Sequence, residues 1–132
     1  MYLLDSNAWI AIFRQKSDAL LNQLKRRSPA EIVLCSVVLS ELWYGVYRSP
    51  TEHRVKNQRL VEDVQARYVS VPLDDAAALN AAELRAHLAA SGQAISPYDL
   101  LIAAIARTRG LTLVTHNVAE FSRVPGLVIE DW

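Results

Sequence analysis

Short apolar runs alternate with longer amphipathic segments along the whole chain. Runs of strand length, each followed by polar or turn residues, predict strands at 2–4, 32–35, 68–71, 111–115 and 127–129. Apolar positions at helical spacing predict helices over 8–13, 18–25, 37–47, 52–67, 74–91 and 97–109, with a helical turn at 119–122. This alternation favours one domain over residues 1–132, an α/β fold built as a three-layer α/β/α sandwich on a mostly parallel central sheet of four to five strands.

Two of the helix starts can be assigned from their capping residues. Ser36 precedes the apolar helix 37–47 and is the expected N-cap of that helix. Ser96 and Pro97 are the expected N-cap and first residue of the helix that ends at Gly110. This last helix is apolar nearly all round, so we expect it at the centre of the protein.

A carboxylate, Asp5, directly follows the first predicted strand. In an open parallel sheet, ligands bind outside the carboxyl ends of the strands, which is where Asp5 should lie. Asp5 or Ser6 also stands where the N-cap of the next helix belongs, so capping alone could explain either residue. A role in chemistry therefore depends on whether other carboxylates reach the same edge.

Glu41 interrupts the apolar face of the predicted helix 37–47. The positions on its side of the helix are Val37, Val38, Tyr44 and Gly45, so the carboxylate rises from an apolar stripe beside a glycine that would let a ligand approach closely. A buried carboxylate is costly without a cation or a strong hydrogen-bond donor. The alternatives are a side chain that reaches the rim of the protein or pairs with an arginine.

Asp99 and Asn117 also stand at expected carboxyl-edge positions. Asp99 lies three residues after Ser96, where a capping box and the helix dipole would both favour an acid. The same helical turn faces the edge at which Asp5 is expected. Asn117 follows the fourth predicted strand and could simply cap the next helical turn. Its neighbour His116 is interpreted as incidental rather than as a general base.

The composition narrows the class of protein. Basic and acidic residues balance, 14 against 14, so the net charge favours no charged partner, although residues 25–27 and 48–59 are locally basic. No apolar run approaches the roughly 20 residues of a membrane-spanning helix, and no signal peptide is expected. The single cysteine, Cys35, lies in an apolar run, which fits a reducing, cytoplasmic location.

Three acids on three elements that meet at one sheet edge suit a hard divalent cation. Mg²⁺ and Mn²⁺ take oxygen ligands, and such an ion can activate a water and orient a phosphodiester. The chain has no CxxC or HExxH motif and no glycine-rich phosphate loop. Zinc chemistry, dinucleotide binding and P-loop hydrolysis are therefore poor fits.

Four short segments, taken together, resemble the motifs of PIN-domain nucleases. In order along the chain they are Leu4-Asp5-Ser6-Asn7, Ser40-Glu41-Leu42 with Gly45, Tyr98-Asp99-Leu100-Leu101-Ile102-Ala103-Ala104, and Val114-Thr115-His116-Asn117. The chain is most similar to the VapC toxins of bacterial toxin–antitoxin pairs. Its ending, which includes Glu120-Phe121 and Glu130-Asp131-Trp132, is typical of that branch.

This resemblance implies a Mg²⁺- or Mn²⁺-dependent endoribonuclease with a PIN-like fold. By position, Asp5 and Asp99 would be the principal metal ligands and Glu41 the third catalytic acid. Asn117 stands where many relatives have a fourth acid. Together with Ser6 and Thr115, it would support the site or a weakly held second metal.

The resemblance also implies partners. A small cognate antitoxin of the VapB type would block the active site, the toxin would form a homodimer, and DNA would be contacted only through the antitoxin. RNA would be the substrate, with tRNA, and initiator tRNA in particular, as candidates, and its cleavage would inhibit translation. Trp43, Tyr44 and Tyr47 could serve the dimer, the antitoxin groove or RNA stacking. No membrane association is expected.

Two other functions fit parts of the sequence. A phosphohydrolase could use Asp5 as a covalent nucleophile, but such enzymes commonly have a second Asp two positions on, where this chain has Asn7. A regulatory module could bind a partner and nucleic acid without catalysis. That module would bind in the presence of EDTA and would yield no RNA product.

Overall fold

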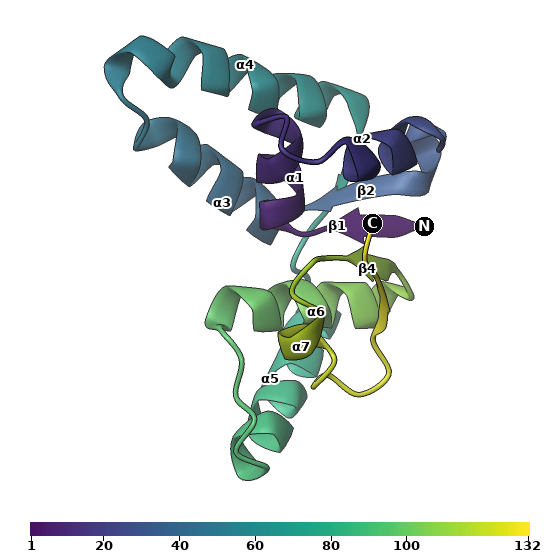
Figure 1. Ribbon diagram of the computed structural model, residues 1–132. Coiled ribbons are helices and arrows are strands. Elements are labelled where there is room, and N and C mark those ends of the chain that lie inside the picture. Colours follow the sequence, from purple (N-terminus) through teal and green to yellow (C-terminus); the bar gives the residue numbers. More distant parts are fainter.

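A five-stranded sheet forms the centre of the computed structural model, which describes all 132 residues. The strands are β1 (Tyr2–Leu4), β2 (Ile32–Cys35), β3 (Val69–Val71), β4 (Thr112–Val114) and β5 (Val128–Glu130). They lie in the order β3-β2-β1-β4-β5, and all four neighbouring pairs are parallel. Figure 1 shows the three central strands, β2, β1 and β4, side by side. The predicted α/β fold with a parallel central sheet is confirmed.

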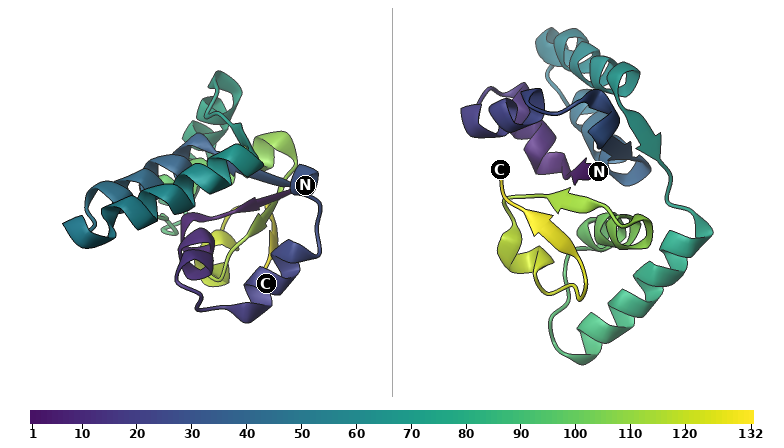
Figure 2. Two further views of the ribbon diagram at one scale, coloured as in Figure 1. Left: turned by 90° about the horizontal axis from the view of Figure 1, so that it is seen from above. Right: turned by 90° about the vertical axis from the view of Figure 1, so that its right-hand side faces the viewer.

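Helices cover both faces of this sheet. Figure 2 shows α1 to α4 on one side of the strands and α5 and α6 on the other. The helices are α1 (Ser6–Phe13), α2 (Asp18–Lys25), α3 (Ser36–Tyr47), α4 (Thr51–Arg67), α5 (Asp75–Ala90), α6 (Pro97–Arg109) and the single turn α7 (Val118–Phe121). None of the helices has the length and the apolar character needed to cross a membrane.

The order of the strands creates one crevice. β2 and β3 are added on one side of β1, and β4 and β5 on the other, so the direction of winding reverses between β1 and β4. Open parallel sheets bind ligands at such a reversal, outside the carboxyl ends of the strands. Asp5 follows β1 and Thr115 follows β4, so these two residues lie at that point.

Helix α6 is the most deeply buried helix and fixes the second face of the sheet. Its residues Ile102 to Ala106 are fully buried, as the apolar pattern of this segment predicted. The three alanines in that stretch have small side chains, which lets the helix backbone lie close to the strands. Because α6 is held so firmly, its first turn, which carries Asp99, has a defined position beside the sheet edge.

Some local predictions were wrong. The N-cap of α3 is Cys35 and not Ser36: its Sγ accepts a hydrogen bond from the Val38 N–H at 3.5 Å. The Ser36 hydroxyl instead accepts from the Leu73 N–H at 3.0 Å, which ties α3 to the loop after β3. A 3₁₀ turn at Pro29–Glu31 was not predicted. The turn has a capping box. The Ser28 N–H donates to the Glu31 carboxylate, and the Ser28 hydroxyl accepts a hydrogen bond from a backbone N–H of the turn.

Candidate active site at the carboxyl edge of the sheet

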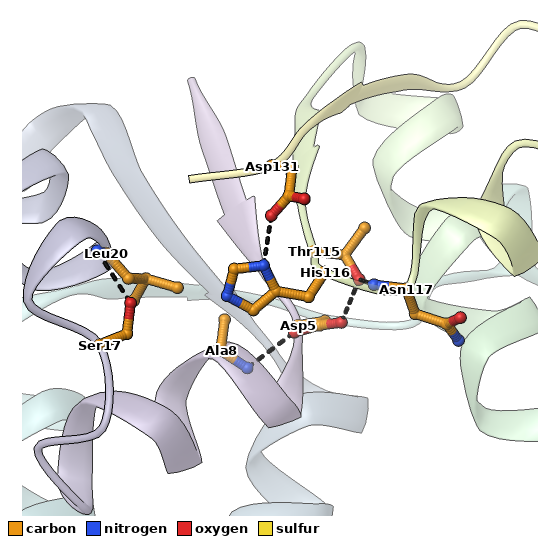
Figure 3. Close-up of polar contacts among 8 residues, drawn as sticks. All are labelled: Asp5, Ala8, Ser17, Leu20, Thr115, His116, Asn117 and Asp131. Atoms are coloured by element: carbon orange, nitrogen blue, oxygen red, sulfur yellow. Dashed lines mark hydrogen bonds and ion pairs between the residues drawn. The ribbon is translucent and has the colours of Figure 1, made fainter.

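Asp5 is both the N-cap of α1 and the innermost acid of the crevice. Its Oδ1 accepts a hydrogen bond from the Ala8 N–H at 2.8 Å, and its Oδ2 accepts one from the Thr115 hydroxyl at 2.6 Å (Figure 3). Only 5% of the residue is exposed. Burial raises the pKa of the Asp5 carboxyl, and the bonds from Thr115 and Ala8 oppose that rise. The Asp5 side chain therefore caps α1 and also lies in the candidate site.

Glu41 reaches the same edge from α3. Its Oε1 accepts a hydrogen bond of 2.6 Å from the hydroxyl of Ser6, the buried first residue of α1. It is not paired with an arginine, which was one of the two alternatives for this residue. Its charge contributes to raising the pKa of both Asp5 and Asp99, and the bond to Ser6 holds it beside the start of α1, next to Asp5.

Asp99 occupies the first turn of α6, where its N–H donates to the Ser96 hydroxyl at 3.3 Å. Its carboxylate does not complete the predicted capping box. Partial burial, and next the charge of Glu120, raise the pKa of Asp99 to about 6. The charges of Asp5 and Glu41 act in the same direction. The charges of three other acids, Glu120, Asp5 and Glu41, therefore act on the Asp99 carboxyl.

Glu120, on α7, is a member of the site that the sequence analysis did not assign. Its Oε1 accepts from the Ser96 N–H at 2.8 Å, the donor that a capping box would have given to Asp99. Its Oε2 accepts from the Asn117 side-chain amide at 2.7 Å. The bond from Ser96, followed by that from Asn117, lowers the pKa of Glu120, so this acid is ionised beside Asp99.

The corner after β4 organises the remaining polar groups. The buried Thr115 hydroxyl donates to Asp5 and accepts from the Asn117 N–H at 2.9 Å. Asn117 is the N-cap residue of α7, as the capping interpretation expected, but its side chain makes no capping hydrogen bond. His116 contacts Asp131 at the surface of the protein (Figure 3).

The donor set of this edge suits a hard divalent cation. Its acids, Asp5, Glu41, Asp99 and Glu120, offer only oxygen atoms, which Mg²⁺ and Mn²⁺ prefer. The only ion pairs in the protein are Arg109–Asp74 and His116–Asp131, so none of the four acids forms an ion pair with a basic side chain. As the side chains stand, no three of them are close enough to hold one ion. Metal binding would therefore require side-chain rotation at this edge.

A hollow of about 370 Å³ opens from the acids along α1 and α3. Its lining residues are mainly polar: Ser6, Asn7, Ile10, Ser40, Glu41, Tyr44, Arg48 and Tyr98. A larger hollow, of about 650 Å³, lies between α5 and α6, is almost entirely apolar and contains none of the four acids. A substrate that reaches Glu41 would therefore occupy the smaller hollow.

Gly45 lies one helical turn from Glu41 and allows a stability test. A Cβ built at this position meets no atom within 4 Å, and the backbone is ordinary α-helix. Glycine inside a helix is less stable than alanine by roughly 0.5–1 kcal/mol. We expect Gly45→Ala to raise the free energy of unfolding by about that amount, measured by urea denaturation. A decrease would show that the added methyl group meets a contact within the chain.

Comparison with known proteins gives consistent results. The PIN domain family model matches residues 2–127. The tRNA(fMet)-specific endonucleases VapC of Salmonella typhimurium and Shigella flexneri are 35% and 37% identical to the chain, over 99% of this chain and 97% of each relative. The solved DNA-bound VapBC from Salmonella typhimurium has a TM-score of 0.91 at 34% identity and covers 99% of this chain and 97% of its own. VapBC2 from Rickettsia felis, bound to a promoter DNA fragment, has a TM-score of 0.88 at 32% identity, with 99% and 98% covered.

Proposed function

Because this chain belongs to the PIN-domain family, and within it to the VapC ribonucleases of toxin–antitoxin systems, we propose that it is a Mg²⁺- or Mn²⁺-dependent endoribonuclease toxin. One observation carries the metal dependence. Four acids from four separate elements lie at the reversal point of the sheet, and none of them forms an ion pair with a basic side chain. Such a cluster of like charges is destabilising unless a cation joins it.

Each acid of this edge would have its own role in hydrolysis. Asp5 and Asp99 would hold the ion, and Thr115 fixes the rotamer of Asp5 for that role. Glu41, fixed by Ser6, would hold the ion or accept a hydrogen bond from the attacking water. When bound, a divalent ion lowers the pKa of a bound water and stabilises the charge on the leaving oxygen. Glu120 orders the first turn of α6 through the Ser96 N–H.

We propose tRNA as the substrate, with initiator tRNA as the first candidate, and inhibition of translation as the result. The support is that the Salmonella and Shigella relatives are named tRNA(fMet)-specific endonucleases. The test is to incubate antitoxin-free protein with total RNA, with and without Mg²⁺ or Mn²⁺, and to map the new ends. A metal-dependent cut in initiator tRNA is expected, and the absence of any RNA product with either ion would refute the proposal.

The proposed partners follow from the solved relatives, which are toxin–antitoxin complexes, two of them bound to DNA. We propose that a VapB-type antitoxin blocks this active site, that DNA binds only to the complex, and that the toxin is a cytoplasmic homodimer. Light scattering of the free toxin would measure the oligomeric state. Gel-shift experiments on promoter DNA, with the toxin alone and in complex, would test how DNA is bound.

The phosphohydrolase alternative is disfavoured by Asn7, which stands where such enzymes commonly have a second Asp. Trapping a covalent phospho-enzyme at Asp5 would reverse this judgement. RNA binding and cleavage measured in EDTA and in Mg²⁺ or Mn²⁺ would test the non-catalytic alternative. A regulatory module would bind RNA in EDTA and would not cleave it in the presence of either ion.

Glu120→Gln is expected to reduce cleavage about 10- to 100-fold, the usual effect of removing a residue that supports a metal site. The same change removes the nearest negative charge from Asp99, so the pKa of Asp99 should fall towards its ordinary value. NMR titration of the carboxyl groups would measure that shift. Glu83→Gln, on the exposed face of α5, is the matched control and should change neither quantity.

A further inference from the structure

One stripe of α3 runs outward from the acids. Glu41, Tyr44 and Arg48 lie at positions i, i+3 and i+7 of the helix and therefore share a face. All three line the hollow of about 370 Å³, whose other walls are α1 and Tyr98 at the start of α6. Arg48 is about 10 Å along the helix axis from Glu41, at 1.5 Å per residue. The hollow thus has an acid at one end and a guanidinium at the other.

The two tyrosines of the hollow present their rings to solvent. Tyr44 is 65% exposed and Tyr98 is 56% exposed, and neither hydroxyl makes a hydrogen bond within the chain. The Arg48 guanidinium lies over the Tyr44 ring, 5.3 Å from its centroid, and Arg48 forms no ion pair. An aromatic ring with a guanidinium beside it is a common arrangement for stacking a nucleobase.

The other aromatic residues of α3 have a structural explanation that Tyr44 lacks. The Trp43 indole N–H donates to Gln65 of α4 at 2.7 Å, and the Tyr47 ring lies 5.9 Å from the Trp43 ring. Trp43 therefore contacts α4, whereas Tyr47 lies against Trp43 and is 69% exposed, and neither residue lines the hollow. Tyr44 points instead into the hollow beside Glu41.

We propose that this hollow is a nucleotide subsite, in which an unpaired base beside the scissile phosphate stacks on Tyr44 while Arg48 contacts the neighbouring phosphate. The subsite rests on the proposed ribonuclease function and defines its substrate more closely: the cut lies in a single-stranded segment. A base must leave its helix to present its face to a side chain. RNA, and not an antitoxin helix, is the proposed occupant because the hollow ends at Arg48, whose guanidinium forms no ion pair within the chain and suits a phosphate.

The first test measures binding apart from cleavage. The full-length protein carries Asp5→Asn to prevent cleavage, and a short fluorescein-labelled single-stranded RNA of mixed sequence is titrated by fluorescence anisotropy in Mg²⁺. Tyr44→Ala should weaken binding about 5- to 100-fold, the usual effect of removing one stacking partner. Tyr44→Trp should restore it. Arg48→Ala should lower the salt dependence by about 0.7 in the slope of log K against log salt, as expected for one lost phosphate contact.

The controls come from the same helix and the same RNA. Tyr47→Ala removes an equally exposed tyrosine of α3, 69% exposed, that does not line the hollow and should change the affinity less than twofold. The same RNA annealed to its complement should bind without dependence on Tyr44. Thermal melts should show that Tyr44→Ala is as stable as the parent protein. In the active protein, Tyr44→Ala should raise KM for tRNA more than it lowers kcat.

The proposal is overturned if Tyr44→Ala binds single-stranded RNA like the parent protein, or if Tyr47→Ala loses as much. It is also overturned if Tyr44→Ala keeps RNA affinity but loses the antitoxin, since the hollow would then be a protein-binding surface. Failure of the ribonuclease proposal looks different. In that case the wild-type protein shows no metal-dependent product, whatever residue stands at position 44.

Discussion

Replacing Asp99 with asparagine is expected to lower RNA cleavage by more than about 100-fold and, at the same time, to stabilise the metal-free protein. The loss should exceed the 10- to 100-fold typical of residues that only support a metal site, because Asp99 would hold the ion itself. The gain in stability follows from the partial burial of Asp99 and the charges of Glu120, Asp5 and Glu41 around it, which raise the pKa of Asp99 to about 6. Asparagine has nearly the same shape without the charge.

The two effects are measured separately. Cleavage is followed on total RNA and on initiator tRNA in Mg²⁺, and stability is followed by thermal melting at neutral pH in EDTA. Asp5→Asn should lose cleavage in the same way. The control is Asp63→Asn, on the exposed face of α4, which should alter neither readout. Retained cleavage in Asp99→Asn would remove Asp99 from the active site, and a lower melting temperature in EDTA would contradict the repulsion argument.

Mg²⁺ or Mn²⁺ is expected to raise the melting temperature strongly above pH 7 and weakly near pH 5. The pKa of Asp99 is raised in the folded protein, so the folded state binds a proton more tightly than the unfolded state. Stability from this group is therefore present below its ordinary pKa of 3.8 and is lost as the pH rises to about 6. Burial raises the pKa of Asp5 in the same direction, whereas the lowered pKa of Glu120 acts in the opposite sense.

A bound cation reverses this dependence because it needs the ionised carboxylates. Below about pH 6, protons compete for Asp99, and the metal affinity should fall by about tenfold per pH unit. At a metal concentration of about 100 times Kd, the stabilisation is about 2.7 kcal/mol, or roughly 10 °C in melting temperature for a domain of this size. Differential scanning fluorimetry at both pH values, with either ion or EDTA, measures it. An equal rise in Asp99→Asn would mean that the metal binds elsewhere.

Much of the fold could be predicted from the sequence because turn and capping residues mark where many of its helices and strands begin and end. The apolar runs at β1 and β2 and the Ser96-Pro97 start of α6 are readable from neighbouring residues alone. The N-cap of α3 was missed by one residue, because Cys35 is the residue whose backbone is extended there and serine is the commoner cap. The 3₁₀ turn at 29–31 was missed because Ser28-Pro29 also marks the end of a helix.

The place of an acid at this edge could be predicted where the acid follows a strand or opens a helix, which is the case for Asp5 and Asp99. Glu120 has no such signal. Its place beside Asp99 depends on a bond to the Ser96 N–H, 24 residues earlier in the chain. The hydroxyl that fixes Asp5 comes from 110 residues away, and the one that fixes Glu41 from 35 residues away. Such pairings are set by the order of the strands, which short motifs do not encode.

The late position of β4 in the chain has a consequence for the order in which the site can assemble during synthesis. β4 enters the sheet beside β1, the first strand to leave the ribosome, and it carries Thr115, the hydroxyl partner of Asp5. A nascent chain therefore holds Asp5 and Glu41 long before the edge that joins them to Asp99 exists. Synthesis must therefore pass β4 before the contact between Thr115 and Asp5 can form, so this edge of the sheet is among the last parts of the fold to assemble.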